Sequence, residues 1–187
     1  MDSAQQVMLL DKAADAVREV SGPERRLLKE VCQQLIGACE RDNLFHWMWN
    51  AIVSEAFGLG DEIKPRFGKL SQVEGACEVV LSRVSYASGS AAVAGFSFQR
   101  GLANVSLENS SLVAEEDCCW EKFQLAVDLV AQLAAAPRRQ MLAACSAALS
   151  SDQDITPDES YIIRGICQRL GYEVPTVLAG QPVLPGT

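Results

Sequence analysis

Four carboxylates near the carboxyl end of the chain form its strongest candidate metal site. They are Asp152, Asp154, Asp158 and Glu159. Carboxylate oxygens suit hard divalent cations, but Pro157 stands where a calcium-binding loop would carry its glycine, and Ile163 stands where it would carry its last glutamate. Glu159 also has a structural explanation, because a glutamate three residues after a threonine caps a helix. We therefore expect these acids to serve the start of a helix, with a divalent metal site as the alternative.

A thiol and the single histidine of the chain form the second chemical candidate. Cys39 and His46 could be part of a soft-metal site or a nucleophile with its base. Zinc needs three or four ligands, and a catalytic thiol needs a base that a third group orients. Neither set is present around these residues, so we expect Cys39 to pack as a small apolar side chain and His46 to lie at a helix start.

The cysteine count indicates reduced thiols. The chain has seven cysteines, an odd number, and they lie in Ala-rich and Leu-rich segments instead of the regular spacings of a disulfide framework. Free cysteine behaves as a small buried hydrophobe. We therefore expect most of these thiols in the core of a cytoplasmic protein.

Two stretches that would position these groups repeat each other at a distance of 113 residues. Residues 10–58 align with residues 123–171 without a gap, and such a duplication indicates a small helical unit used twice. The matched pairs include Ala13 with Ala126, Asp15 with Asp128, Val17 with Val130, Arg25 with Arg138, Arg26 with Arg139, Cys32 with Cys145, and Gly58 with Gly171.

Each stretch predicts three amphipathic helices, because apolar residues recur at spacings of three and four. In the first stretch the helices are expected over 8–20, from 24 to about 39, and over 43–56; in the second, over 117–135, 137–149 and 156–170. The apolar stripe of the first helix is Leu9, Ala13, Ala16, Val17 and Val20. The stripe of the second helix is Leu27, Leu28, Val31, Cys32, Leu35, Ile36 and Cys39.

The segment between the two stretches has no counterpart in the repeat. It predicts a helix over 72–86, a shorter one over 91–102 and a Ser/Asn-rich loop over 104–114, and we expect it to pack between or across the repeated units. No strand pattern is visible. The expected fold is an all-α helical bundle of two related three-helix units (9–60 and 116–173), a helical insert with a loop (61–115) and a flexible Pro/Gly tail (174–187).

Charge and hydropathy exclude two classes of partner. The formal net charge of −8 opposes binding to nucleic acid, which requires clustered basic residues. No apolar run approaches the roughly 20 residues that span a bilayer, and the amino terminus lacks the pattern of a signal peptide. We therefore expect a cytoplasmic protein without direct membrane insertion.

Several segments resemble a known family. Residues 35–47, Leu-Ile-Gly-Ala-Cys-Glu-Arg-Asp-Asn-Leu-Phe-His-Trp, resemble a stretch in the C-terminal portion of HtpX-like membrane zinc metallopeptidases, proteases with chaperone function. The typical sequence there is Leu-Ile-x-Ala-Asp-Gly-x-Ile-Asp-Leu-Phe-Glu-Trp. Segments 66–70, 76–81, 137–145, 152–159 and 163–167 fit the same family region in order, so the resemblance covers about residues 9 to 178. Each half is also similar to the TerB-like helical domain, which is associated with tellurite and stress responses.

The resemblance implies a binding role and not an enzyme. The peptidase signature is His-Glu-x-x-His on a zinc-binding helix, and His46 is the single histidine of this chain. The implied function is a non-catalytic accessory or regulatory domain at the cytoplasmic face of the membrane, with zinc only in a peptidase domain absent from this chain. Its partner would be that domain or another protein. The alternative is a free-standing TerB-like stress-response protein that binds a divalent metal ion.

Three residues are candidates for contact with a partner. Phe45 and Trp49 share one helix face, so Trp47 lies on another and must be covered by the insert or exposed as an interaction anchor. We expect it to be covered. Arg138 and Arg139 stand at a helix start, where solvation is the expected role and partner docking the alternative.

Overall fold

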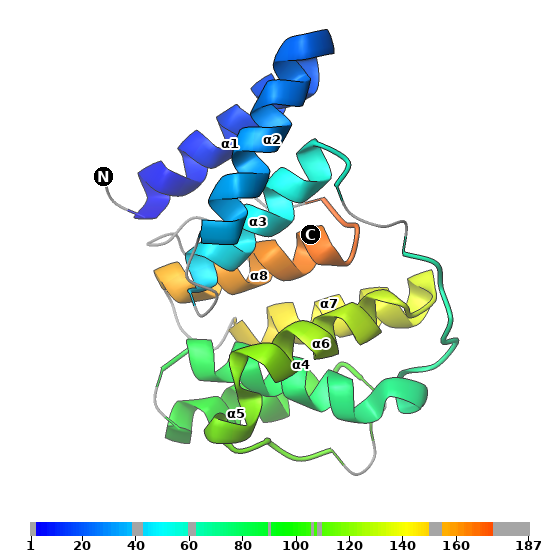
Figure 1. Cartoon of the computed structure of the whole chain (residues 1–187). Coiled ribbons are helices and arrows are strands. Elements are labelled where there is room, and N and C mark those ends of the chain that lie inside the picture. Colours follow the sequence, from blue (N-terminus) through cyan, green and yellow to red (C-terminus); the bar gives the residue numbers. More distant parts are fainter. Residues whose placement is uncertain are drawn as a thin grey trace.

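The chain folds entirely into helices over the part that the structure describes (Figure 1). The structure is a computed structural model, and the described residues are 3–38, 43–59, 63–89, 91–105, 107, 110–149 and 155–173. Its elements are α1 (Ser3–Glu19), α2 (Gly22–Ala38), α3 (Leu44–Ala56), η1 (Leu70–Val73), α4 (Glu74–Ala87), α5 (Ala91–Leu102), η2 (Glu115–Cys118), α6 (Trp120–Ala131), α7 (Ala135–Leu149) and α8 (Pro157–Arg169). The predicted all-α bundle is confirmed at this level. Strand-like pairing within the described residues is limited to one parallel bridge between Phe67 and Leu133.

The third helix of each half begins at a side-chain cap. The Asn43 side chain accepts the His46 backbone N–H at 3.2 Å at the start of α3. At α8 the Thr156 hydroxyl accepts the Glu159 N–H at 3.2 Å, and the Glu159 carboxylate accepts the Thr156 N–H at 2.7 Å. These bonds satisfy backbone donors that a helix start leaves free. The predicted cap at Thr156 is therefore confirmed.

The same two helices stop at glycines with left-handed backbone. Gly58 follows α3 with φ of 62°, and Gly171 follows α8 with φ of 72°. This region of φ is unfavourable for residues with a Cβ, which is why glycine commonly follows a helix end. The two third helices thus begin and end in the same way.

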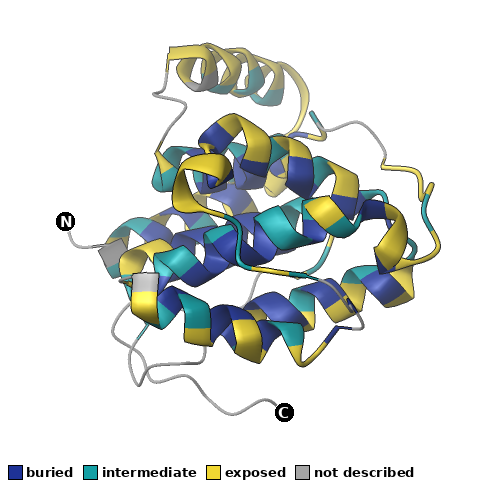
Figure 2. Ribbon diagram, turned by 90° about the horizontal axis from the view of Figure 1, so that it is seen from below, coloured by how far each residue is buried: buried dark blue, intermediate teal, exposed yellow. Residues whose placement is uncertain are grey.

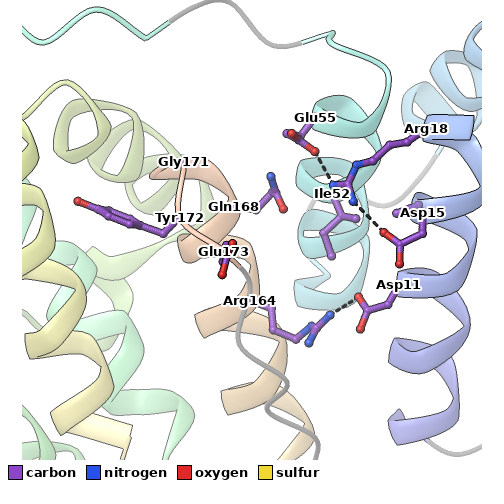
Figure 3. Close-up of a pocket in the computed structure, with 11 residues that line it drawn as sticks. Asp11, Asp15, Arg18, Ile52, Glu55, Arg164, Gln168, Gly171, Tyr172 and Glu173 are labelled. Atoms are coloured by element: carbon purple, nitrogen blue, oxygen red, sulfur yellow. Dashed lines mark hydrogen bonds and ion pairs between the residues drawn. The ribbon is translucent and has the colours of Figure 1, made fainter. Parts of the chain in front are cut away.

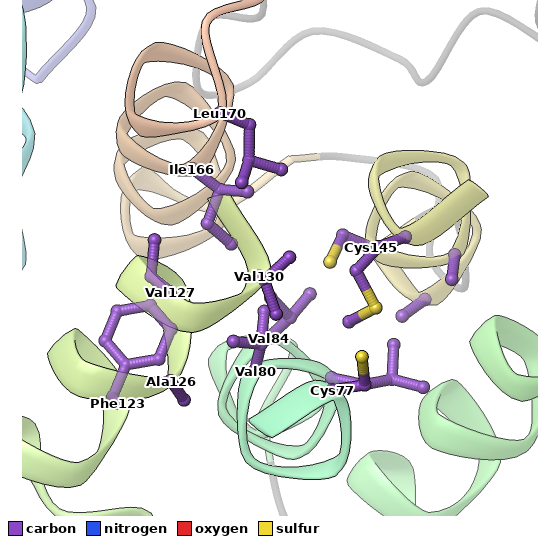
Figure 4. Packing of buried hydrophobic residues seen from close by; sticks show 14 of the residues in the cluster. Cys77, Val80, Val84, Phe123, Ala126, Val127, Val130, Cys145, Ile166 and Leu170 are labelled. Atoms are coloured by element: carbon purple, nitrogen blue, oxygen red, sulfur yellow. The ribbon is translucent and has the colours of Figure 1, made fainter. Parts of the chain in front are cut away.

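The main core surrounds α4. The Cys77, Val80 and Val84 side chains of α4 lie among apolar side chains of α6, α7 and α8 (Figure 4). Among the described residues, α4 and α5 pack against α6, α7 and α8, and they make no comparable contact with α1, α2 or α3. The insert therefore completes the core of the second half instead of lying between or across both halves, as the sequence suggested.

A glycine allows α5 to approach α7 closely. A Cβ on Gly101 would lie 2.6 Å from Leu81 Cδ1, 2.8 Å from the Ala144 carbonyl oxygen and 3.2 Å from Ala148 Cβ. Contacts this short cannot form, and two of the three neighbours belong to α7. Small side chains therefore set the distance between the two helices.

The two halves meet where α3 packs along α8. Trp47 of α3 lies over Gly165 of α8, where a Cβ would stand 2.1 Å from Trp47 Cζ3. The indole ring also packs against Trp120, at 5.7 Å between ring centroids, and Phe123, at 5.1 Å, both on α6. Trp47 is only 7% exposed. It is covered as expected, but by α6 and α8 and not by the insert, so it is not an exposed interaction anchor.

The first two helices are packed much less fully. The buried face of α1 is Val7, Leu10 and Ala14, which contact α3 and Tyr161 of α8 in a second apolar cluster. Leu9, on the predicted stripe of α1, is instead 57% exposed. No α2 residue whose burial the structure describes is buried (Figure 2). The predicted helices exist, but two of their apolar faces point to solvent.

The described helices include none with both the length and the apolar character needed to cross a bilayer.

Candidate functional site

The buried thiols are unsuited to nucleophilic chemistry. Burial raises the pKa of Cys77 from 9.0 to about 12 and that of Cys118 from 9.0 to about 11. Burial also raises the pKa of Cys145 and of Cys167 well above 9.0. Thiolate is the reactive form, so these four groups stay protonated and inert near neutral pH.

The acidic turn does not assemble a metal site within the described residues. Asp152 and Asp154 lie outside them. Asp158 is exposed, whereas Glu159 is fully buried and bonded to the Thr156 backbone. Across the described ranges, no three His, Cys, Asp or Glu side chains converge as metal ligands would. The two placed acids thus occupy the helix start that the capping pattern predicts.

The other chemical candidates lie apart from one another. His46 lies in the first turn of α3, as expected, and Cys39 falls outside the described residues. Arg138 is half-buried, with its guanidinium donating to the Ala131 carbonyl at 3.3 Å and lying 5.6 Å from the centre of the Tyr172 ring. Arg139 is exposed. The structure brings none of these side chains together into a reactive set.

A cleft of about 630 Å³ opens between α1, α3 and the end of α8 (Figure 3). We call it the charged cleft, since its wall mixes both signs. The charged side chains that line it are Asp11, Asp15, Arg18, Glu55, Arg164 and Glu173. Sequence analysis did not identify it. Its one sequence signal is Arg164, a cation within the apolar run 161–167 of α8.

The deepest polar contact of the charged cleft joins α1 to α8. The Arg164 side chain is 1% exposed and forms an ion pair with Asp11, whose side chain is 38% exposed. Burial lowers the pKa of Arg164 and raises that of Asp11, and the attraction between them opposes both shifts only in part. The pair joins α1 to α8, and the cost of burying its charges offsets part of the attraction between them.

Two shallower ion pairs, both made by Arg18, close the rim. Arg18 donates to Asp15 at 2.8 Å and to Glu55 at 2.9 Å, and each of these side chains is at least half exposed. The hydrogen bond to Glu55 is the largest cause that raises the pKa of Arg18. Exposed pairs of this kind contribute about 0–1 kcal/mol. The charged cleft holds polar groups bonded to each other, and its wall contains no thiol, hydroxyl nucleophile or imidazole apart from the Tyr172 hydroxyl.

A smaller cleft of about 130 Å³ lies in the corresponding place between α3, α6 and α8. Three of its residues, Gln124, Val127 and Asp128, stand 113 positions after Asp11, Ala14 and Asp15 of the charged cleft. The position that corresponds to Arg164 is Ala51. The two clefts thus share a location while their chemistry differs.

Several large apolar side chains are exposed on α2. Four side chains of one stripe are exposed, and we name them the α2 stripe: Leu27 (63%), Leu28 (40%), Val31 (44%) and Leu35 (51%). Positions 27, 31 and 35 follow each other at four residues, and 28 stands beside them, so they cover about 100° of the helix surface. Contiguous exposed apolar surface marks a contact site more often than scattered residues do.

Three of the four corresponding side chains in α7 are covered, whereas Gln140, which corresponds to Leu27, is exposed. Met141, Ala144 and Ala148 stand 113 residues after Leu28, Val31 and Leu35, and all three are fully buried. The helices themselves correspond, because α2 and α7 begin at 22 and 135, and α3 and α8 span 44–56 and 157–169. One face is therefore packed in the second half and open in the first.

Matching contacts hold the corresponding helices together. Arg25 donates to the Val17 carbonyl at 2.8 Å and to the Arg18 carbonyl at 3.4 Å, and Arg138 donates to the carbonyl of Ala131, which corresponds to Arg18, at 3.3 Å. Each arginine also lies beside an aromatic ring, Phe57 or Tyr172, although these two rings do not stand at corresponding positions. In both halves the arginine at the start of the second helix binds the end of the first helix.

Comparison of the chain with protein-family models, with curated proteins and with solved structures gives no match in any of the three.

Proposed function

We propose that this chain is a non-catalytic accessory or regulatory domain that binds an HtpX-like zinc metallopeptidase through the α2 stripe. The observation that carries the binding role is the exposure of four large apolar side chains on one face of α2, between 40% and 63% each. The identity of the peptidase rests on the resemblance of the segments quoted above. Burial raises the pKa of the Cys77 and Cys145 thiols, and Arg164 in the charged cleft is paired with Asp11.

We also infer that the chain consists of two related TerB-like units. Support comes from the helix starts that recur at 113 residues, the paired arginines at 25 and 138, and the paired glycines at 58 and 171. The two copies differ in what covers their second helix and in the charge of their clefts. A shared scaffold with different surfaces suits a binding domain better than a twofold active site.

Binding of the purified chain to a purified HtpX-like peptidase in detergent micelles tests the proposal. Wild type should bind saturably, and Val31→Asp and Leu35→Asp should each weaken binding at least tenfold, because each places a charge in the apolar contact. Gln33→Asp, an exposed position off the stripe, is the matched control and should bind as wild type does. Absence of binding by wild type, or chelator-sensitive proteolysis by the chain alone, would overturn the proposal.

A further inference from the structure

The second half shows how the face that α2 leaves open can be filled. There α6 and α7 diverge, and α4 lies between them (Figure 4). Ala126 and Val130 of α6 and Cys145 of α7 are buried in the cluster that contains the α4 side chains. A single amphipathic helix thus completes the packing of the first two helices of that half.

The first half presents the same positions without that helix. Ala13 and Val17 of α1 correspond to Ala126 and Val130, which are both buried. Ala13 is exposed, and Val17 is half-buried at the edge of the second apolar cluster. On α2, Leu28, Val31 and Leu35 of the stripe correspond to Met141, Ala144 and Ala148, which are buried in the same cluster as the α4 side chains. We name the surface formed by Ala13, Val17 and the α2 stripe the open face. Among the described residues, no helix stands on it as α4 stands between α6 and α7.

The backbone around the open face is arranged for the same kind of packing. Arg25 and Arg138 each bind the last carbonyls of the preceding helix, at 2.8 Å and 3.3 Å, and each lies against an aromatic ring that follows the third helix. These contacts tie the start of the second helix to the end of the first in both halves.

From this correspondence we infer that the open face binds one amphipathic α-helix of a partner protein, which packs between α1 and α2 as α4 packs between α6 and α7. The inference rests on the proposed function and specifies the kind of segment that the partner contributes. Apolar side chains of the bound helix should recur at i, i+3 or i+4, and i+7, as Cys77, Val80, Leu81 and Val84 do in α4.

Side-chain size limits the site to one helix. In the second half α5 also reaches α7, because Gly101 meets the small Ala144 and Ala148. The corresponding residues of α2 are Val31 and Leu35, whose bulk keeps an incoming helix further from the α2 axis. The open face therefore accepts a helix in the place of α4 and excludes a close neighbour like α5.

The α4 sequence itself provides the probe. A fluorescent peptide of residues 74–87 carries a hydrocarbon staple between positions 75 and 79, away from the buried stripe, and alanine replaces Cys77 to prevent oxidation. The staple is needed because an isolated helix of this length is only marginally stable in water. Fluorescence anisotropy should show saturable binding to the full chain, weakened at least tenfold by Val31→Asp and unchanged by Gln33→Asp.

Each other outcome counts against the inference. A stapled peptide with Val80→Asp and Val84→Asp that binds as tightly as the parent would overturn it, as would failure of the parent peptide to bind. If light scattering shows that wild type dimerises and Leu35→Asp restores the monomer, a second copy covers the face and the inference is wrong. If the peptide does not bind but the chain binds the peptidase through the α2 stripe, the inference fails and the proposed function stands. If neither the peptide nor the peptidase binds, both the inference and the proposed function fail.

Discussion

Replacement of Gly165 by alanine tests the packing that joins the two halves. A glycine-to-alanine change within a helix normally stabilises by about 1 kcal/mol. At this position the new Cβ would lie 2.1 Å from Trp47 Cζ3, 2.5 Å from Cε3 and 2.9 Å from Cη2. The indole cannot move away easily, because Trp120 and Phe123 pack against it. Overpacking of this kind costs about 1–3 kcal/mol.

The severity of the contact places the cost near the upper end, so the net effect of Gly165→Ala should be a loss of about 2 kcal/mol. For a chain of this size that corresponds to a fall in Tm of about 4–8 °C. Urea denaturation followed by circular dichroism measures the free energy of unfolding, and a thermal scan measures Tm.

Two further variants make the experiment decisive. Gly95→Ala, in the middle of α5 with no atom within 4 Å of its added Cβ, should raise Tm by about 2–4 °C. In a Trp47→Leu background, which is destabilised by itself, Gly165→Ala should no longer cost stability, because the crowding ring is gone. A Gly165→Ala protein as stable as Gly95→Ala, or a cost that persists without Trp47, would refute the assigned contact.

Four more outcomes are expected. Leu35→Asp should change the free energy of unfolding of the isolated chain by less than about 0.5 kcal/mol, because the side chain is 51% exposed, and a large loss in urea denaturation would mean that α2 is packed. Thr156→Ala should cost about 1 kcal/mol in the same assay through loss of the α8 cap, and an unchanged midpoint would contradict that role. Burial raises the pKa of Cys77 from 9.0 to about 12, so the native state stays protonated to a higher pH than the unfolded state, and the stability that this provides is complete below pH 9.0 and lost as pH rises towards 12. Cys77→Ala should lessen the alkaline fall in stability by about 1.4 kcal/mol per pH unit in this window. An identical slope in the variant would argue against burial of the thiol. Calcium, magnesium or zinc should leave Tm unchanged, whereas a shift that disappears in Asp152→Asn and Asp154→Asn would favour the alternative of a metal-binding stress protein.

Local sequence signals predicted most of the helices well, but the helix expected over 117–135 is instead η2 (Glu115–Cys118) followed by α6 (Trp120–Ala131). The Thr156-to-Glu159 spacing gave the start of α8 correctly, and the glycines at 58 and 171 stop α3 and α8. The helix at 91–102 was predicted with the same ends that the structure has. These features depend on contacts a few residues apart, so periodicity and capping are sufficient to find them.

Long-range packing could not be read in the same way. The stripes on α1 and α2 have the periodicity of buried faces, but periodicity shows that a face is apolar and not that anything covers it. Whether Val31 is exposed and Ala144 is buried depends on where the insert packs, and that position is a tertiary outcome. The Asp11 to Arg164 ion pair joins residues 153 positions apart, for which a single sequence contains no signal.

Hydrogen exchange monitored by mass spectrometry, on the full chain alone and in complex with the HtpX-like peptidase, tests the central claim most directly. Amide exchange becomes slower where a helix gains packing. We expect fast exchange across α2 in the free chain and slower exchange of residues 8–38 in the complex, with α6 to α8 unchanged. Protection confined to α6 to α8, or no protection when the peptidase is present in excess, would contradict the claim that the open face is the binding surface.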